Sequence, residues 1–305
     1  MMKKAAISVM VLLGFVFFAS AQNILKQASD TSVPEASAFD PNFYIFLCFG
    51  QSNMEGNARF EPQDTVVDDR FRVLESVDCP NLGRVKGSWY PAVPPLCRCR
   101  TGLTPADYFG RMLVAHLPSG VRVGVINVAV GGCKIELFDK EHYASYAATA
   151  PAWMIGMIRE YEGDPYGRLL EMARRAQKEG VIKGILLHQG ESNTNDSLWP
   201  AKVKTVYNNL LRDLDLRPDS VPLLAGEMVN ADQGGKCASM NAIIATLPRT
   251  IPNAHIISSA GCTDAADNLH FNAAGYRMLG RRYALEMLSL LGYKTGDEKE
   301  GPYNQ

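Results

Sequence analysis

Apolar and polar positions alternate along the chain in two different patterns. Five short runs are apolar at nearly every position and rich in β-branched or aromatic residues, namely residues 43–48, 121–128, 181–188, 221–227 and 255–258. Between them, apolar residues recur at helical spacing in residues 104–117, 166–179, 201–214, 239–246 and 273–291. Runs that are apolar on both faces are typical of parallel strands covered on two sides. The pattern therefore predicts an α/β fold, a three-layer αβα sandwich with a five-stranded parallel sheet.

Residues 57–103 are the exception to this alternation. The stretch contains five prolines and three cysteines and shows little periodicity. A segment of this length without regular structure is usually functional or disordered. The adjacent aromatic residues Trp89 and Tyr90, together with the cysteines, favour an ordered loop that folds over an edge of the sheet.

The first residues have the pattern of a secretory leader. Two lysines precede an apolar stretch at residues 5–18, and a small-residue cleavage pattern follows at residues 19–21. We expect a signal peptide at residues 1–21, a linker at 22–40, one folded domain at 41–292 and a tail at 293–305. A retained membrane anchor is the alternative, but the apolar stretch is shorter than the ~20 residues that a spanning helix needs. After cleavage the chain is expected to have no membrane span and to be secreted or periplasmic.

The charge balance narrows the classes of partner. The chain has 305 residues, with 31 Lys and Arg against 32 Asp and Glu, and it contains no dense basic stripe. This balance argues against nucleic acid and anionic membrane surfaces as partners and favours a small neutral substrate.

Seven cysteines occur, an odd number that leaves at least one without a partner in the chain. Cys48 lies within the first predicted strand, where a buried apolar role is expected. Cys97 and Cys99 lack the spacing of a zinc site, so no metal is expected there. A staple within the loop that involves Cys79 is the preferred alternative. The sequence does not determine which cysteines pair.

The strongest candidate for chemistry is Ser52, which follows the first predicted strand in the sequence FLCFGQSNMEG. The residue after such a strand lies at the carboxyl edge of an open α/β sheet, where ligands bind. Serine alone is a weak nucleophile and requires a base, a group that orients the base, and donors for an oxyanion. We therefore expect these groups at the ends of other strands.

Asp267 and His270 can supply the base and its orienting group. They follow the last predicted strand and are three residues apart in the turn before the last helix. That spacing can place the carboxylate beside the imidazole, holding Nδ1 protonated and leaving Nε2 free as the base. A surface turn in which Asp267 caps backbone amides is the alternative. Asp264 is a second candidate for the orienting group, at a longer spacing.

Two further strand ends carry candidate oxyanion donors. Gly131 and Gly132 follow the second predicted strand, and Gln189 follows the third. Glycines let backbone N–H groups approach a bound atom closely, so these groups, the Ser52 N–H and the Gln189 side chain could form a three-donor site. The alternatives are a tight turn at the glycines and a polar loop in which Glu191 pairs with an arginine.

Taken together, these motifs resemble the SGNH-hydrolase superfamily. The matching blocks are GQSNM at Ser52, the pair Gly131-Gly132, HQGES at residues 188–192 and DNLHF at residues 267–271. Residues 89–96 and 102–107 are also similar to the carbohydrate-esterase branch, which groups acetyl xylan esterases with sialate O-acetylesterase-type domains. The likeness covers residues 43–291 in order and implies a flavodoxin-like fold.

The resemblance also implies a role for each block. Ser52 is then the nucleophile, His270 the general base and later the acid, and Asp267 the group that orients the imidazole. The N–H groups of Ser52 and Gly132 and the side chain of Gln189 form the oxyanion hole. Gln189 stands where many members of the superfamily have asparagine, whereas the carbohydrate-esterase branch commonly carries glutamine. No metal or organic cofactor is implied.

Several neighbouring residues have open roles. For Glu191, structural support of the site is preferred over a second acidic partner for His270. Glu227 and Asn230 are candidates for the lining of a sugar pocket. Trp89 and Tyr90 either face the sugar or pack the loop onto the sheet. Further candidates for support of the site or for substrate contact are Gln51, Asn53 and Gly131.

The resemblance implies a secreted serine esterase that removes O-acetyl groups from a carbohydrate through an acetyl-serine intermediate. Acetylated xylan or a related plant polysaccharide is the first choice of substrate, and a sialate O-acetylesterase is the alternative. A non-catalytic carbohydrate-binding protein on an esterase fold is a rival, because fold alone does not establish activity. A lipase or thioesterase of the same superfamily is another. The glycan and the oligomeric state are left open.

Overall fold

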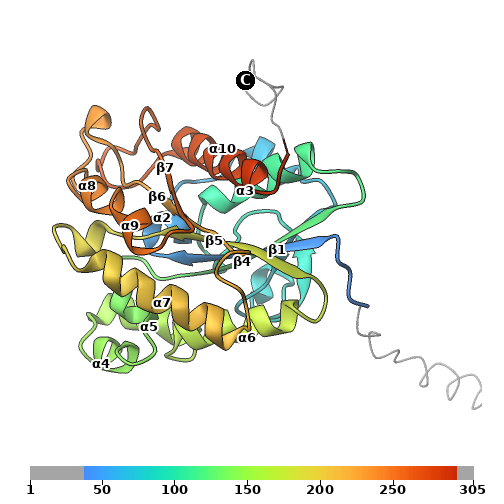
Figure 1. Ribbon diagram of the computed structural model, residues 1–305, viewed down its shortest axis with the longest axis horizontal. Helices are drawn as coiled ribbons and strands as arrows, with labels where there is room; N and C mark the ends of the chain where they lie inside the picture. Colours follow the sequence, from blue (N-terminus) through green and yellow to red (C-terminus); the bar gives the residue numbers. More distant parts are fainter. Residues whose placement is uncertain (1–37, 294–305) are drawn as a thin grey trace, which may run out of the picture. The chain divides into compact units, whose positions relative to one another are not determined.

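A seven-stranded sheet runs through residues 38–293, the part of the chain that the computed structural model describes (Figure 1). Its strand order is β3-β2-β4-β1-β5-β6-β7. Neighbouring strands are parallel except for β3, which pairs antiparallel with β2. The strands are β1 (Phe43–Gly50), β2 (Phe71–Leu74), β3 (Trp89–Pro91), β4 (Arg122–Ala129), β5 (Val181–His188), β6 (Leu223–Gly226) and β7 (Ala254–Ile257).

The five strands expected from the sequence form the centre and one side of this sheet. They correspond to β1, β4, β5, β6 and β7, and their spatial order in terms of chain order is 2-1-3-4-5, the flavodoxin-like arrangement. The expected count of five is wrong, because residues 57–103 add β2 and β3 at the edge beside β4. The α/β class and the parallel core are confirmed.

Helices lie on both sides of the sheet (Figure 1). α3 (Pro105–His116) and α10 (Ala273–Leu290) pack together on one face, and α6 (Pro165–Ala176) and α7 (Trp199–Asp213) lie on the other. The shorter helices are α2 (Ser52–Glu55), α4 (Tyr143–Ala148), α5 (Ala152–Glu160), α8 (Met240–Ile244) and α9 (Leu247–Thr250). The expected helices correspond to α3, α6, α7, α8 and α10, whereas the sequence pattern does not predict α2, α4, α5 or α9.

The central strand β1 is held from both sides. Alternate side chains of a strand point to opposite faces. Ile45, Leu47 and Phe49 join the apolar cluster that contains α6 and α7, whereas Phe46 and Cys48 join the cluster that contains α3 and α10. All five side chains are fully buried, Cys48 as expected. The carboxyl end of β1 is therefore a fixed position for the residues that follow it.

Residues 57–103 are ordered at the sheet edge, as expected, but they contain more regular structure than the sequence indicates. β2 extends the sheet beside β4, and β3 closes the edge. A disulfide joins Cys79 to Cys99, so the expected staple involving Cys79 is present. In the same part of the chain Cys97 is a free, buried thiol.

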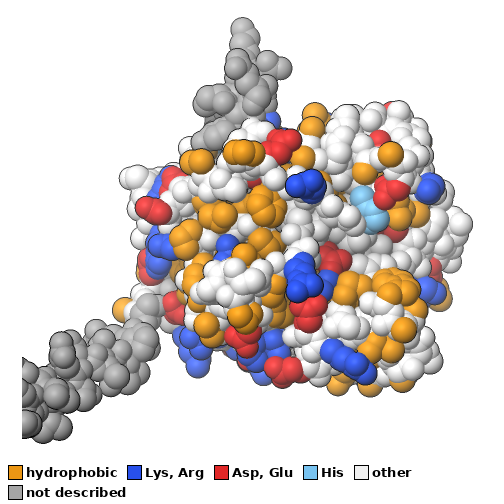
Figure 2. Space-filling view, turned by 180° about the vertical axis from the view of Figure 1, so that it is seen from behind, with side chains coloured by type: hydrophobic (Ala, Val, Ile, Leu, Met, Phe, Trp, Pro, Cys, Tyr) orange, Lys and Arg blue, Asp and Glu red, His pale blue; other side chains and the backbone are white. Residues whose placement is uncertain are grey.

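The surface carries both signs of charge. On the face that Figure 2 shows, Lys and Arg side chains lie among Asp and Glu side chains, in keeping with the formal net charge of −1. Within residues 38–293, no helix combines the length and apolar content needed to cross a membrane. The expected signal peptide lies outside the described residues, and so do almost all of the expected linker and almost all of the expected tail.

Candidate active site

Ser52 lies just beyond the carboxyl end of β1, as the first residue of α2. The turn before it brings β1 close to β5, because the N–H of Gln51 donates to the carbonyl of His188 (3.0 Å). A Cβ atom on Gly50 would lie 2.0 Å from the same oxygen, so only glycine fits at this point. Ser52 is 8% exposed and stands between β1 and β5, where the strand order reverses and ligands bind in this fold.

His270 and Asp267 stand beside Ser52 on the turn before α10. The Nε2 atom of His270 lies 2.8 Å from the Oγ atom of Ser52, and its Nδ1 atom lies 2.7 Å from Oδ2 of Asp267. The other carboxylate oxygen of Asp267 accepts from the N–H groups of Leu269 and His270, both at 3.0 Å. The carboxylate, the imidazole and the hydroxyl are therefore in the order of a Ser-His-Asp triad.

The surroundings of Asp267 keep its carboxyl group ionised. Partial burial acts to raise the pKa of Asp267, but hydrogen bonds from the His270 imidazole and from two backbone N–H groups lower it to about 2. An ionised carboxylate at Nδ1 holds a proton there and leaves Nε2 to accept the Ser52 proton. Asp264, the alternative orienting group, instead accepts from the side chain of Asn268 (3.1 Å).

Asn53 joins α2 to the turn that carries His270. Its Nδ2 atom donates to the carbonyl of Leu269 (3.0 Å), and its Oδ1 atom accepts from the N–H of Phe271 (3.2 Å). These are the residues on either side of His270. Oδ1 also accepts from the hydroxyl of Tyr276 (2.7 Å). Because Asn53 is fully buried, it supports the spacing between the serine and the histidine and does not reach a substrate.

Glu191 is buried behind Asn53. Its Oε1 atom accepts from Nδ2 of Asn53 (2.6 Å), and its Oε2 atom is buried without a hydrogen-bond partner. Burial raises the pKa of Glu191 to about 7. Within residues 38–293 it pairs with no arginine and makes no hydrogen bond to His270. The geometry thus favours structural support over a second acidic partner for the imidazole.

The turn after β4 places two glycines near the nucleophile. A Cβ atom on Gly131 would lie 2.5 Å from Oε2 of Glu55, the last residue of α2. Gly132 has a φ angle of 69°, a left-handed conformation that favours glycine. Within the described residues, the N–H groups of Gly132 and Ser52 have no protein acceptor. Both donors are therefore available to a bound oxygen atom.

Gln189 follows β5 as expected, but its side chain is bonded within the protein. Its Nε2 atom lies within hydrogen-bond distance of three protein acceptors, Oδ1 of Asn193 (2.7 Å), Oε1 of Gln51 (3.1 Å) and the carbonyl of Cys133 (3.2 Å). An amide nitrogen has only two protons to donate. The Oε1 atom accepts from the indole N–H of Trp199 (2.5 Å). The side chain of Gln189 is therefore a buried cross-link, and these contacts do not support the expected oxyanion role.

The side-chain amide nitrogen of Gln51, which precedes the nucleophile, has no protein acceptor in the described residues, unlike the amide nitrogen of Gln189. Its Oε1 atom accepts from Nε2 of Gln189 and from the N–H of Ser192 (3.2 Å), so the orientation of the amide is fixed. In the described part of the chain its Nε2 atom has no acceptor, yet this nitrogen is not sealed from solvent. The residue before Ser52 thus carries a fixed amide whose nitrogen is free to donate.

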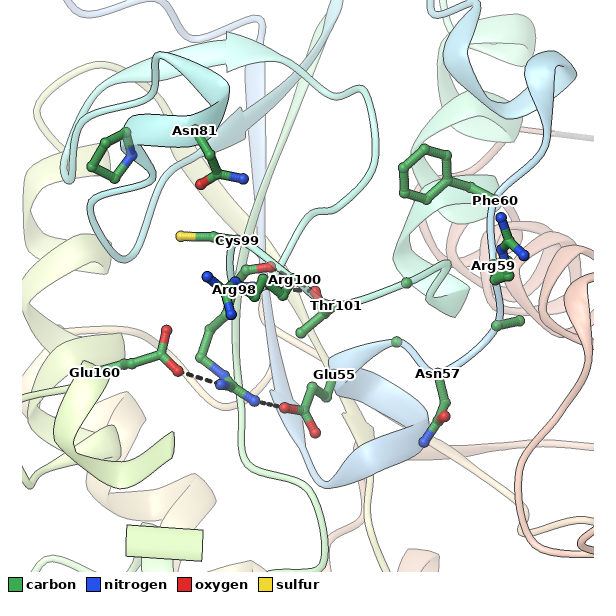
Figure 3. Close-up of a pocket in the computed structure, with 14 residues that line it drawn as sticks. Glu55, Asn57, Arg59, Phe60, Asn81, Arg98, Cys99, Arg100, Thr101 and Glu160 are labelled. Atoms are coloured by element: carbon green, nitrogen blue, oxygen red, sulfur yellow. Dashed lines mark hydrogen bonds and ion pairs between the residues drawn. The ribbon is translucent and has the colours of Figure 1, made fainter. Parts of the chain in front are cut away.

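A pocket of about 830 Å³ opens beside α2 (Figure 3). Arg98 reaches across it and forms ion pairs with both Glu55 and Glu160. Glu55 and Ser52 are three residues apart on α2, so their Cβ atoms are neighbours at about 5–6 Å. The other polar side chains of the pocket are Asn57, Arg59, Asn81, Arg100 and Thr101. Within residues 38–293 no cluster of three or more His, Cys, Asp or Glu side chains is placed to hold a metal ion.

Trp89 is not near the nucleophile. It lies in β3, half-buried, with its ring centroid 4.7 Å from that of Phe43 at the amino end of β1. At about 3.3 Å per residue, the length of β1 puts Trp89 roughly 20 Å from the carboxyl edge. Of the two roles left open for Trp89, its contact with Phe43 supports packing of the loop onto the sheet.

Glu227 and Asn230 serve local structure. The carboxylate of Glu227 accepts from the N–H of Ser259 (3.0 Å), and the side chain of Asn230 accepts from the N–H of Ala231 (2.7 Å). These bonds hold the loops after β6 and β7, and neither side chain contacts Ser52 or His270. These hydrogen bonds do not support the expected role of Glu227 and Asn230 in lining a sugar pocket.

Trp153 is near the site, although the sequence pattern does not indicate it. It lies in the first turn of α5 and is 61% exposed. A Cβ atom on Gly132 would lie 2.5 Å from its Cη2 atom. The spacing of Met154 and Ile158, both buried, is the signal by which this helix could have been found.

The chain is similar to known proteins in sequence and in fold. A sequence model described as carbohydrate esterase, sialic acid-specific acetylesterase matches residues 42–289. A protein of Arabidopsis thaliana has a similar structure, with a TM-score of 0.63, 21% identity, and coverage of 82% of this chain and 99% of that chain. The structure of NanS gives a TM-score of 0.61 at 16% identity, covering 83% of this chain and 99% of that chain.

A third similar structure belongs to a longer protein, described as a novel carbohydrate acetylesterase from Xanthomonas citri. Its TM-score is 0.57 at 18% identity, and the match covers 82% of this chain and 57% of that chain. At these identities the three structures show that the fold is shared.

Proposed function

The chain belongs to the sialic acid-specific acetylesterase family of carbohydrate esterases, and from this premise we propose that it is a serine esterase that removes O-acetyl groups from a carbohydrate. The observation that carries the proposal is the continuous hydrogen-bonded series from Asp267 through His270 to Ser52, with links of 2.7 and 2.8 Å. Such a series activates a serine for acyl transfer.

The proposed reaction uses these groups in two steps. His270 Nε2 takes the Ser52 proton as Oγ forms a bond to the acetyl carbon, and the carbonyl oxygen becomes an oxyanion. Nε2 then returns the proton to the sugar oxygen as the bond between that oxygen and the acetyl carbon breaks. Water, deprotonated by His270, attacks the acetyl-serine, and acetate leaves with regeneration of the Ser52 hydroxyl.

For the oxyanion we propose three donors, the N–H groups of Ser52 and Gly132 and the side-chain amide of Gln51. The two backbone groups have no acceptor in the described residues, and the Gln51 amide is oriented by bonds to its oxygen. Donors held in place before the reaction stabilise the developing charge without reorganisation. Gln189 acts on this arrangement indirectly, by holding Gln51.

The pocket beside α2 favours a sugar over a lipid chain as the rest of the substrate. Its lining includes amide, hydroxyl and charged side chains as well as Phe60 and Pro80, and it reaches the nucleophile helix at Glu55 but contains neither Ser52 nor His270. The polar groups suit the hydroxyl groups of a glycan better than an acyl tail. Acetylated xylan or a related plant polysaccharide remains the first proposed substrate. An O-acetylated sialic acid is the second proposed substrate, and the sialic acid specificity in the name of the family supports it. The leader pattern in residues 1–21 supports secretion or export to the periplasm.

The test of the proposal is acetate release from acetylated xylan and from O-acetylated sialic acid, together with hydrolysis of a small aryl acetate. We expect Ser52→Ala to lower turnover of every accepted substrate by about 10⁴-fold or more. Ser197→Ala, a change at an exposed serine before α7, is the matched control and should leave turnover unchanged. Activity of the Ser52→Ala protein within tenfold of wild type would exclude Ser52 as the nucleophile.

The rival function, a non-catalytic carbohydrate-binding protein, is separated by a fluorophosphonate probe. An activated serine is labelled by such a probe, whereas an ordinary hydroxyl is not. We expect one label per chain, located on Ser52 and absent from Ser52→Ala. An unlabelled wild-type protein that still binds acetylated glycans would favour the rival.

A further inference from the structure

Trp153 is a large apolar side chain left in solvent. It is 61% exposed, whereas Trp199 is fully buried and Trp89 is half-buried against Phe43. Large aromatic side chains contribute mainly through the area that they bury. A single exposed apolar side chain is common, so it is the position of this indole beside Gly132 that makes it a candidate for contact with a ligand.

The helix that carries Trp153 does not need the indole for its own packing. α5 is anchored by Met154 and Ile158, which are 2% and 3% exposed and belong to the core cluster under the sheet. These residues are four apart and lie on one face of the helix. Trp153 precedes this face, so its ring is directed away from the core.

The ring stands against one of the proposed oxyanion residues. A Cβ atom on Gly132 would lie 2.5 Å from Cη2 and 3.2 Å from Cζ3 of Trp153, so the absent side chain leaves room for the indole edge. Gly131 makes room in the same way for Glu55, which lines the pocket of Figure 3. The two glycines thus lie between an aromatic surface and a polar pocket.

We propose that Trp153 is a sugar-binding residue, whose exposed face stacks on the pyranose ring that carries the acetyl group. The C–H face of a pyranose is flat and apolar, and an indole face matches it in size. The ring would rest on Trp153 while the acetyl carbonyl reaches Ser52 and Gly132. This inference rests on the proposed esterase function and extends it to the part of the protein that holds the sugar.

Intrinsic fluorescence gives a direct test of binding. In the Ser52→Ala background, which prevents turnover, titration with an acetylated xylo-oligosaccharide and with an O-acetylated sialic acid should change tryptophan emission with at least one of them. Trp153→Phe in that background should abolish the change. Trp89→Phe, the matched control, should retain it because Trp89 packs on Phe43. A change that persists in Trp153→Phe would overturn the proposal.

Steady-state kinetics provide the second test. Loss of a stacked aromatic residue corresponds to roughly tenfold weaker binding, so we expect Trp153→Ala to raise KM for the acetylated sugar by about that factor. Hydrolysis of ethyl acetate, which has no ring, should stay within twofold. Equal losses on both esters would show a structural role beside Gly132 and overturn the proposal, as would an unchanged KM for the sugar.

The proposed function and the proposed role of Trp153 are contradicted by different results. If wild type hydrolyses ethyl acetate but releases acetate from no sugar, the proposed function fails. If wild type deacetylates a sugar and Trp153→Ala does so with the same KM, only the role of Trp153 fails.

Discussion

Nδ2 of Asn53, on the nucleophile helix α2, donates a 2.6 Å hydrogen bond to Oε1 of Glu191, and both side chains are buried. The second oxygen of Glu191 is buried without a partner. Because burial disfavours the ionised form, the pKa of Glu191 is raised to about 7. The support of the site therefore contains a carboxyl group whose charge changes near neutral pH.

Glu191→Gln should change the pH dependence of stability. The folded-state pKa lies above the ordinary value of 4.5, so the folded protein keeps a proton that the unfolded chain loses. Stability must then fall as pH rises through this range, and the glutamine variant lacks that loss. Between pH 5 and pH 8, we expect the free energy of unfolding of the variant to gain about 2 kcal/mol relative to wild type.

Urea denaturation at the two pH values measures this difference. The unpaired amide of the glutamine adds a constant cost at both pH values, so only the change with pH is diagnostic. A difference that is the same at pH 5 and pH 8 would contradict a raised pKa at Glu191.

Gln51→Ala should lower turnover with little effect on KM. Removal of one oxyanion donor typically costs on the order of 10²-fold in kcat, because the interaction is made in the transition state. The measurement is kcat and KM on a small aryl acetate, together with the melting temperature. Wild-type turnover in this variant would remove Gln51 from the oxyanion site.

Gln189→Ala tests the other half of that assignment. The change leaves the buried indole N–H of Trp199 without its acceptor and removes one of the donors to the oxygen of Gln51, which keeps the N–H of Ser192. Each buried polar group without a partner costs about 1–3 kcal/mol, so this variant should be clearly destabilised. If Gln189→Ala instead keeps the melting temperature and loses turnover about 10²-fold, its side chain is the oxyanion donor after all.

The core of the fold could be predicted from the sequence because each buried strand is apolar on both faces. The missing strands, β2 and β3, are four and three residues long. Runs this short carry little periodicity, and β2 is defined by its pairing with β4, which lies about fifty residues later in the chain. Such pairing is a tertiary effect that a local pattern does not contain.

The site could be predicted only as far as its residues follow strands. Ser52, Gly132 and His270 lie at strand ends or in the turn before the last helix, so topology brings them together. The direction of an amide is different, because it depends on which acceptors surround it. Gln189 is an example, because hydrogen bonds with Trp199 and Gln51 fix the direction of its amide group. Trp153 is missed because only two buried residues, Met154 and Ile158, mark the inner face of its helix.

Asp267→Asn should lose about 10⁴-fold in turnover, because an amide in place of the carboxylate no longer holds the required tautomer of His270. Asp264→Asn is a close control, since Asp264 contacts Asn268 and not the imidazole. We expect the control to stay within threefold of wild type in kcat on an aryl acetate, a range that corresponds to about 0.7 kcal/mol. If instead Asp264→Asn shows the larger loss, Asp264 is the orienting group.

Arg98 connects the disulfide-linked loop to the nucleophile helix. It neighbours Cys99, which is bonded to Cys79, and its guanidinium group pairs with buried Glu55 at the end of α2. Glu160 of α5 is its second partner, at 2.5 Å (Figure 3). Removing one partner of a buried pair leaves an uncompensated charge, which typically costs about 3–5 kcal/mol.

Arg98→Met should therefore lower the free energy of unfolding by about 3 kcal/mol. Adding Glu55→Gln should recover most of that loss, because the buried carboxylate that Arg98 neutralised is then replaced by an uncharged amide. Arg100→Ala, a change at an exposed arginine of the same pocket, should stay within about 0.5 kcal/mol of wild type. Urea denaturation of wild type, Arg98→Met, Glu55→Gln and the double variant measures the coupling. Additive effects of the two substitutions would mean that Arg98 stabilises the loop by packing alone, without neutralising the charge next to Ser52.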